Sequence, residues 1–334
     1  MQGKSYYVKD PDYQPDPELG KYPHERSVEE RLKSGIVVVD KPASPSSQQV
    51  SSWVKEMLKV NKAGHVGTLD PSVSGVLPIL LGKATKIMPY MHLLPKTYVT
   101  LMHLHEKVDP ALVEKVLNDY VGKDFLHTPP KKSAVKRKPR KRKIYDIEVL
   151  EIEGKDVLFK ATVESGTYMR VFCIDVGKKL GVKAHMQELR RIESGGFSEE
   201  HAVDLNELKE KAWLYFEKQN DDALNDIIYP VERGVKHLPK VFVKDVAVSA
   251  ILYGAPLYYK GIVMAQQNIK EGEIIAVMTM KGELVGIFRS LGNLEDIKKK
   301  FKGIFARPLA IVMDRNAYPK LWKAKENEDG DAGI

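Results

Sequence analysis

Hydrophobic and polar positions predict that ordered structure begins at a first β-branched run. Residues 35–41 form this run, and a proline ends it, which is typical of a buried strand. Apolar residues then recur at helical spacing over 50–58, and Ser46 or Ser47 can cap the start of this helix. Residues 61–75 are too rich in glycine and small polar residues for a regular element, and a second apolar run follows them. The pattern therefore predicts a polar loop held between two buried segments.

Two runs in the middle of the chain predict a β-hairpin. Apolar and polar residues alternate over 145–153 and 157–163, and a phase change at Leu150 predicts a bulge there. Upstream, 97–105 reads as a strand, and 109–123 reads as a helix with an aspartate cap and a proline at its first position. Strands and helices mix without a regular βαβ rhythm, so the fold class expected is α+β over a mixed, largely antiparallel sheet.

The length of 334 residues suggests about two domains, at roughly 150 residues each. Residues 1–34 carry four prolines and no apolar period, so we expect an extended arm, packed on the C-terminal module. Residues 35–237 form the expected main domain. Short apolar runs separated by glycine over 238–322 predict a small β-barrel, and 323–334 read as a solvated tail.

Composition narrows the class of protein. The chain has 53 lysines and arginines against 45 acids, a net charge of +8, which mildly favours a polyanionic partner. Its single cysteine, Cys173, excludes an internal disulfide and a cysteine-based zinc site, and it fits a reducing compartment. No apolar stretch approaches the roughly 18 residues that a membrane span needs, and no signal peptide is recognisable. We expect a cytoplasmic protein without a membrane partner.

Residues 131–143 form the most charged run, with nine basic residues and no acid. Such a run can bind phosphates, or it can be a solvated face. The basic residues are Lys131, Lys132, Lys136, Arg137, Lys138, Arg140, Lys141, Arg142 and Lys143.

The polar loop is the best candidate site. Its string GHVGTLDPSVSG places a histidine, an aspartate and several glycines on a scaffold between buried strands. The alternative is a turn in which Asp70 bonds its own backbone ahead of a proline, and His65 alone favours a structural role. The glycine-rich phosphate-binding motifs and HExxH are absent, and no histidines are spaced as metal ligands, so redox, kinase and zinc-hydrolase functions lose their usual support.

Six runs follow one another along the chain: VVVDKPASPSSQQV, AGHVGTLDPSVSGVLPILLGKATK, KTYVTL, PPKKSAVKR, ESGTYMR and AHMQELRR. In this order they resemble the motifs of TruB-type pseudouridine synthases, most closely the archaeal branch related to dyskerin, the catalytic subunit of box H/ACA guide-RNA particles. The resemblance covers residues 35–197, and residues 238–322 resemble the PUA RNA-binding domain that follows in this family. It implies a catalytic domain of the pseudouridine synthase type followed by a PUA-like domain.

The resemblance implies isomerisation of uridine to pseudouridine in RNA, without cofactor or metal. It makes Asp70 the essential carboxylate and Arg170 its cationic partner. A carboxylate can attack an oxocarbenium-like sugar carbon, but in a water-poor pocket it stays ionised only beside a cation. Tyr98 matches the tyrosine that stacks on the flipped base, although a strand tyrosine in the core is the alternative.

The same resemblance implies substrate-binding roles for Lys41, His65, Tyr168 and Leu189. It also places 131–143 at the family's thumb loop, which clamps RNA.

Stand-alone bacterial members of this family carry extra segments after the strand that corresponds to the one with Tyr98, whereas here only HLHEKVDP separates that strand from the next helix. The resemblance therefore implies that target choice falls to a guide. The resemblance then implies as partners an H/ACA guide RNA, substrate RNA, a small zinc-ribbon-like protein, a glycine/arginine-rich-type protein and a kink-turn-binding protein. The expected function is guided modification of rRNA, with tRNA as a further substrate. A stand-alone tRNA pseudouridine-55 synthase and a non-catalytic RNA scaffold remain alternatives.

Overall fold

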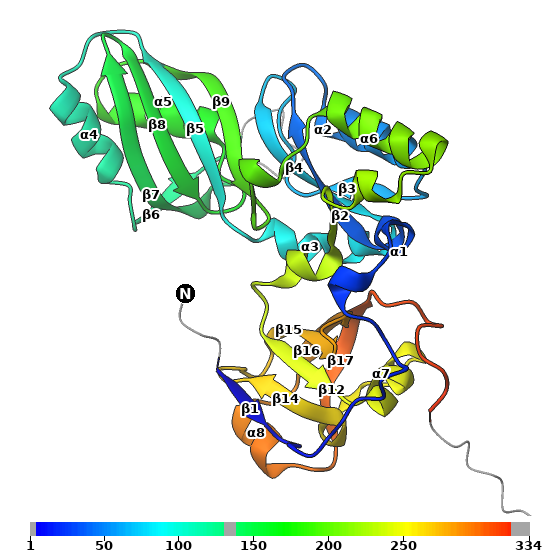
Figure 1. Ribbon diagram of the computed structural model, residues 1–334. Helices are drawn as coiled ribbons and strands as arrows, with labels where there is room; N and C mark the ends of the chain where they lie inside the picture. Colours follow the sequence, from blue (N-terminus) through cyan, green and yellow to red (C-terminus); the bar gives the residue numbers. More distant parts are fainter. Residues whose placement is uncertain (1–4, 130–137, 322–334) are drawn as a thin grey trace, which may run out of the picture. The chain divides into compact units, whose positions relative to one another are not determined.

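A computed structural model describes residues 5–129 and 138–321. The chain folds as two compact units (Figure 1). One comprises Gly35–Tyr229, and the other joins the N-terminal segment up to Ser34 to the chain from Pro230 onward.

The unit 35–229 is built on a ten-stranded sheet. Eight strands follow the order β11-β2-β4-β9-β5-β8-β7-β6, while β3 pairs with β4 and β10 with β9. The strands β4 and β9 are parallel, and most other neighbours are antiparallel, which confirms the expected sheet. The strands are β2 (Gly35–Lys41), β3 (Ala63–His65), β4 (Ser74–Leu81), β5 (Lys96–Leu104), β6 (Asp124–His127), β7 (Arg140–Glu153), β8 (Asp156–Val163), β9 (Ala184–Ser194), β10 (Phe197–Ser198) and β11 (Ile228–Pro230).

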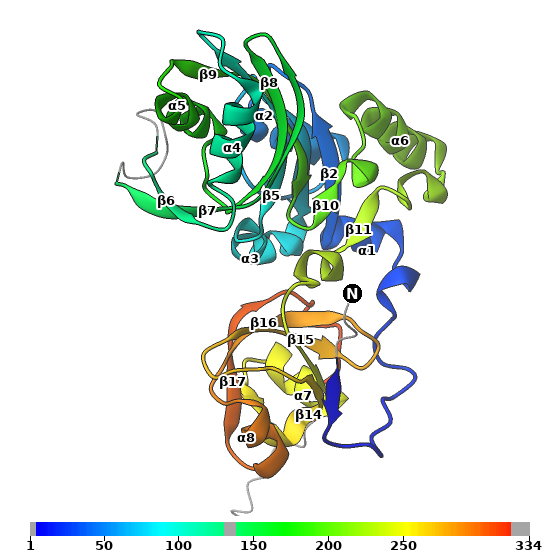
Figure 2. The ribbon, with the colours of Figure 1, turned by 90° about the vertical axis from the view of Figure 1, so that its left-hand side faces the viewer.

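Helices cover the two halves of this sheet separately. The helices α4 and α5 pack on the half that contains β7 and β9, whereas α2 and α6 pack beside β2, β3 and β4 (Figure 2). Both helix caps expected from the sequence are confirmed: Ser46 accepts from the Gln49 amide, and Asp109 accepts from the Ala111 amide. The helices are α2 (Ser47–Met57), α3 (Met88–His92), α4 (Pro110–Asn118), α5 (Met169–Lys179) and α6 (Leu205–Lys218).

The core of this unit lies between the sheet and the helices α4 and α5. Met102 of β5, Phe159 of β8 and Phe172 of α5 are fully buried in it. The single cysteine, Cys173, is buried in the same cluster, and burial raises the pKa of its thiol to about 12. This thiol is therefore a packing group rather than a nucleophile.

The β7–β8 hairpin contains the expected bulge and a second one. The register shifts between Val149 and Glu151, which confirms the bulge at Leu150. A further shift lies between Ile144 and Asp146. Tyr145 is exposed and Ile144 is buried there, so the alternation predicted from residue 145 does not place the Tyr145 side chain on the buried face.

The other unit is a seven-stranded sheet in the order β1-β14-β12-β15-β16-β17-β13. Its first strand comes from the N-terminal arm, where Tyr6–Val8 pairs antiparallel with Met264–Gln266 of β14. The elements are β1 (Tyr6–Val8), α1 (Val28–Lys33), β12 (Lys240–Val243), α7 (Asp245–Leu252), β13 (Leu257–Tyr258), β14 (Ile262–Gln266), β15 (Ile274–Thr279), β16 (Leu284–Ser290), α8 (Leu294–Lys299) and β17 (Ile304–Ile311).

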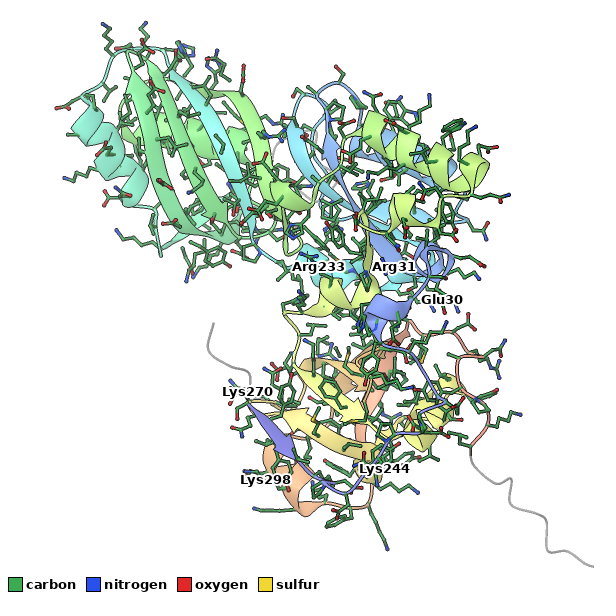
Figure 3. All side chains as sticks on the ribbon, in the orientation of Figure 1. Glu30, Arg31, Arg233, Lys244, Lys270 and Lys298 are labelled. Carbon is green, nitrogen blue, oxygen red and sulfur yellow. The ribbon has the colours of Figure 1, made fainter. Side chains whose placement is uncertain are left out.

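Charged and aromatic contacts hold the arm along this sheet. Lys244, which precedes α7, forms an ion pair with Asp10, and Lys298 of α8 lies over the Tyr7 ring (Figure 3). The arm is not extended throughout, because Ser27 and Glu30 form a capping box that starts α1. The spacing S-x-x-E was visible in the sequence and marks this helix.

No helix in the described ranges combines the length and apolar character that a membrane crossing requires.

Candidate active site

An ion pair joins the polar loop to helix α5. Arg170, in the first turn of α5, places its Nη2 atom 2.8 Å from Oδ2 of Asp70, which lies between β3 and β4. The Asp70 carboxylate is therefore bound by a residue a hundred positions away and is not a local turn bond. About half of each side chain is exposed, 47% for Asp70 and 48% for Arg170. The water-poor pocket expected around Asp70 is thus not formed by these side chains alone.

Hydrogen bonds fix the backbone on both sides of Asp70. The buried Ser47 hydroxyl, at the start of α2, accepts from the Leu69 amide at 2.8 Å and donates to the Leu69 carbonyl at 3.0 Å. On the other side, the Pro71 carbonyl accepts from Lys41 Nζ at 3.1 Å and from the Ser44 amide at 2.9 Å. The carboxylate is consequently carried by a rigid loop.

Lys41 is wholly buried, and its ammonium binds backbone carbonyls beside this loop. Its ammonium also donates to the Pro42 carbonyl at 2.7 Å. Burial lowers its pKa, as does the charge of Arg191, and the charge of Asp70 opposes this shift. Lys41 therefore lies within electrostatic reach of the Asp70 carboxylate.

A second buried cation, Arg191 of β9, lies behind the loop. Its Nε donates to the Val76 carbonyl at 2.8 Å and its Nη2 to the Gly67 carbonyl at 2.8 Å. The backbones approach closely here: a Cβ on Gly75 would lie 2.1 Å from the Arg191 carbonyl oxygen. Gly75 has a φ of +110°, so the close pairing of β4 with β9 at this point requires glycine.

Tyr98 lies on β5 opposite Arg191 of β9. Burial lowers the pKa of the Arg191 guanidinium, whereas the adjacent Tyr98 raises it. The ring is only 9% exposed and belongs to the same buried cluster as Leu69 and Val73, which flank the Asp70 turn. Leu189 is half-buried against that cluster, two residues before Arg191 on β9.

His65 closes the start of the loop. Its Nδ1 is 3.0 Å from the Ser51 hydroxyl and its Nε2 is 3.1 Å from the Thr68 hydroxyl. Burial lowers its pKa, with further lowering from the charges of His92 and Arg191, which favours the neutral ring. These contacts make His65 a structural brace at the start of the loop that carries Asp70.

Tyr168 occupies the position just before α5, the helix that presents Arg170. Its amide donates to Nε2 of the buried His127 at 3.0 Å, and the two rings stack at 5.7 Å with an interplanar angle of 11°. His127, from β6, was not among the sequence candidates. It fixes the backbone two residues before Arg170.

The basic run is not a loop over its whole length. Residues 140–143 begin β7 and pair antiparallel with residues 124–127 of β6. Lys138, Arg140 and Lys141 are exposed, whereas Arg142 is held 3.5 Å from Glu164 and Lys143 is half-buried. Lys131, Lys132, Lys136 and Arg137 lie outside the described residues.

Within 5–129 and 138–321, no group of three or more His, Cys, Asp or Glu side chains is arranged to hold a metal ion. One pocket, lined by residues including Leu94, Pro95, Phe197 and His201, contains neither Asp70 nor Arg170.

Two buried cations of this region, Arg191 and Lys96, were missed by sequence reasoning. Lys96 donates to the His92 carbonyl at 2.5 Å and the Leu94 carbonyl at 2.7 Å. Both lie beside residues that the motifs did single out, Leu189 in ELRR and Tyr98 in KTYV. Nothing in those strings shows which basic side chain points inward.

Comparison with known protein families divides the chain into four matched segments. Residues 55–169 match the N-terminal domain of TruB family pseudouridylate synthases, and 170–236 match the C-terminal domain of tRNA pseudouridylate synthase B. Residues 239–312 match the PUA domain, and 2–51 match the DKCLD domain.

Similar proteins extend over nearly the whole chain. A probable tRNA pseudouridine synthase B of Methanocaldococcus jannaschii is 46% identical over 92% of each chain, and that of Archaeoglobus fulgidus is 44% identical over 98% of this chain and 100% of its own. Among solved structures, a Cbf5-Nop10-Gar1 complex contains a chain 42% identical, with a TM-score of 0.90 over 95% of this chain and 97% of that one. An H/ACA RNP bound to a substrate RNA containing 2′-deoxyuridine contains one 40% identical, with a TM-score of 0.89 over 96% and 98%. The chain therefore belongs to the TruB family of pseudouridine synthases and is an isomerase with a PUA domain.

Proposed function

We propose that this protein isomerises uridine to pseudouridine at positions chosen by an H/ACA guide RNA, chiefly in rRNA. The observation that carries the chemistry is the Asp70–Arg170 ion pair on an anchored loop. The choice of a guided enzyme is supported by the similarity over nearly the full chain to a protein solved in an H/ACA RNP.

Asp70 is the proposed nucleophile or electrostatic partner of the sugar. Its half-exposed carboxylate is accessible to a nucleotide, whose base would exclude water from the ion pair. Arg170 pairs with the carboxylate and orients it. The target nucleotide must leave its helix, at a cost of a few kcal/mol.

Tyr98 is the proposed stacking residue for the flipped base. Stacking contributes about 1–3 kcal/mol per base and would offset much of the cost of flipping. Lys41, His65, Tyr168 and Leu189 would shape the loop and the pocket wall, at one remove from the reacting bond.

The short connection after β5 also supports guided targeting. Only residues 105–109 lie between β5 and α4, which leaves little room for an RNA-reading insertion. Reading of the sequence around the target would then fall to base pairing with a guide, while the protein holds the RNA backbone. The proposed partners are guide RNA and substrate RNA, with counterparts of Nop10 and Gar1, the proteins named in the similar complex. A kink-turn-binding protein is a further proposed partner.

A second candidate is a stand-alone tRNA pseudouridine synthase. It is favoured by the names of the similar sequences, which are probable tRNA pseudouridine synthases B. The non-catalytic scaffold is set aside, because the chain belongs to an enzyme family.

The test compares the purified protein on tRNA with the protein assembled with partners, guide and a matched target RNA. We expect pseudouridine in the guided target at a rate at least about tenfold above that for tRNA without a guide. Equal or faster conversion of tRNA alone would overturn guided targeting. Asp70→Asn serves as the matched inactive control: it should bind RNA within a few fold of the unmodified protein and form no pseudouridine.

A further inference from the structure

We propose that Arg191, supported by Lys96, is a positioning residue of the active site that fastens the Asp70 loop to the sheet from behind. This inference rests on the proposed function of Asp70 and adds a residue to it. It concerns how the loop is held and assigns Arg191 no contact with substrate.

The side chain of Arg191 is built into the fold as a clamp. It is only 1% exposed, although it is an arginine on a strand. One edge of the guanidinium reaches Val76, inside β4, and the other reaches Val66 and Gly67, at the start of the loop. The single planar group therefore joins the strand after Asp70 to the chain before it.

The clamp is unusual because its partners are not acids. Among the described residues, no carboxylate forms an ion pair with Arg191, and its hydrogen bonds go to main-chain carbonyls and to Tyr98. Burial lowers the pKa of this guanidinium, which reflects the cost of placing the charge there. Burying a cation without a carboxylate partner destabilises the folded protein. We therefore attribute the presence of Arg191 to the loop geometry that it fixes.

Lys96 adds a second cation against the same segment. A Cβ on Gly67 would lie 3.0 Å from Nη1 of Arg191 and 3.5 Å from Cε of Lys96, so both side chains pack on the Gly67 backbone. Lys96 also donates to Ser165 at 3.0 Å. Burial and the charge of Arg191 lower the pKa of Lys96 to about 8.

Neither lysine nor an apolar residue can replace the clamp. A lysine at position 191 would keep the charge, but its single ammonium lacks the fixed fork that spans Val76 and Gly67. A methionine would leave those carbonyls without their donor. In both cases the loop can shift relative to α5, and a displacement of about 1 Å can cost about a hundredfold in rate.

Arg190 provides a matched control on the same strand. It is the adjacent residue, but its side chain lies at the surface, where it pairs with Asp40 at 2.8 Å and Glu199 at 2.6 Å. Its hydrogen bonds go to these acids and to Ser74 rather than to the loop carbonyls that Arg191 binds. Arg190→Met and Arg191→Met therefore remove the same charge on opposite faces of β9.

The experiment measures kcat, KM and the thermal unfolding midpoint for Arg191→Lys, Arg191→Met and Arg190→Met in the complete particle, with the unmodified protein in parallel. We expect kcat to fall at least about tenfold for Arg191→Lys and about a hundredfold for Arg191→Met, with KM within about threefold. Arg190→Met should keep kcat within about threefold. Because Arg191→Met can fail to fold, Arg191→Lys is the deciding variant, and it should unfold within a few degrees of the unmodified protein.

A folded Arg191→Lys protein with unchanged kcat would overturn the proposal. So would a loss that affects KM alone, because that would make Arg191 an RNA-binding residue. If the unmodified particle is inactive on its guided target but the protein converts tRNA, the proposal of guided targeting fails. The Arg191 and Arg190 variants are then compared by their rates on tRNA, so the proposal for Arg191 is still tested. The two failures are therefore distinguishable.

Discussion

The ammonium of Lys41 donates a hydrogen bond to the carbonyl of Pro71, the residue that follows Asp70. Lys41 ends β2, so this bond ties the loop to that strand of the sheet. Together with the Ser47 contacts to Leu69, it limits the movement of Asp70 from both sides.

Replacing Lys41 by methionine should therefore slow the reaction without unfolding the protein. We expect Lys41→Met to lower the single-turnover rate by about tenfold to a hundredfold, because the loop loses one anchor. The free energy of unfolding should change by less than about 1 kcal/mol. The variant loses these hydrogen bonds, but it no longer buries a cation, and the two effects offset each other. Quench-flow assays and urea unfolding measure the two effects, with the exposed Lys55→Met on α2 as control. A folded variant with full activity would exclude the positioning role.

The partner of Asp70 gives a second prediction. Arg170→Met should lower kcat by about a hundredfold or more, the loss typical when an electrostatic group beside reacting atoms is removed. Arg170→Lys should recover part of it, because the charge remains while the guanidinium geometry is lost. The measurement is the initial rate at saturating RNA. Lys178→Met, on the same helix but paired with Asp175, should retain the normal rate. An Arg170→Met enzyme with a near-normal rate would refute the role.

Local patterns predicted much of this fold, and the reasons are physical. The caps at Ser46 and Asp109 and the bulge at Leu150 follow from spacing along a few residues. The second bulge beside Tyr145 could not be predicted. Residues 140–143, which precede Ile144, are all basic, so they do not show which face of the strand each side chain occupies. The burial of Arg191 could not be predicted either. It follows Arg190 in the sequence, and only the pairing of β9 with β4 decides which of the two side chains is buried.

Lys96 gives a prediction for the pH dependence of stability. Its pKa is about 8 in the folded protein and near the ordinary 10.5 in the unfolded chain. Between these values the unfolded chain binds more protons, so this group adds to the stability as the pH rises from about 8 towards 10.5. Below a pH of about 8, Lys96 is charged in both states, and its burial opposes folding in full.

The variant Lys96→Met should lack this contribution. Its free energy of unfolding relative to the unmodified protein should therefore decline as the pH increases from about 7.5 to about 10. Urea unfolding at several pH values measures the difference, in which the other titrating groups cancel. A difference that is constant with pH would show that Lys96 titrates normally. Lys62→Met serves as the control, because this side chain is exposed and lies outside the buried site.

The exposed part of the basic run predicts a salt effect. Replacing Lys138, Arg140 and Lys141 by glutamine should weaken RNA binding and flatten its salt dependence, because fewer counterions are released. Each phosphate that is no longer neutralised lowers the slope of log K against log salt by about 0.7–0.9, so the slope of the triple variant should fall by up to about 2–3. Filter binding across a salt series measures this. Three glutamines at Lys209, Lys211 and Lys218 of α6 control for net charge. If the salt dependence of RNA binding were unchanged in the variant at Lys138, Arg140 and Lys141, these residues would contact a protein partner rather than RNA.

The buried ion pairs of Arg26 give a prediction for how strongly the N-terminal arm is attached to its unit. Its guanidinium pairs with Glu232 at 3.0 Å and Glu283 at 3.3 Å, and all three side chains are at most 14% exposed. Burial raises the pKa of Glu283, while the Arg26 charge lowers it, so the arginine is what makes a charged Glu283 tolerable there. Removing one partner of a buried pair costs about 3–5 kcal/mol, and Arg26→Met should destabilise this unit by an amount of that order.

Urea unfolding at neutral pH measures the loss. The same variant should recover part of its stability at a pH of about 5, since burial raises the pKa of Glu283 and protonation of this carboxylate removes its uncompensated charge. Lys21→Met provides the control, because its pair with Glu30 is exposed and contributes little. If Arg26→Met and Lys21→Met proved equally stable, the buried pair would not anchor the arm, and attachment would rest on the pairing of β1 with β14 and on contacts such as the ion pair of Asp10 with Lys244.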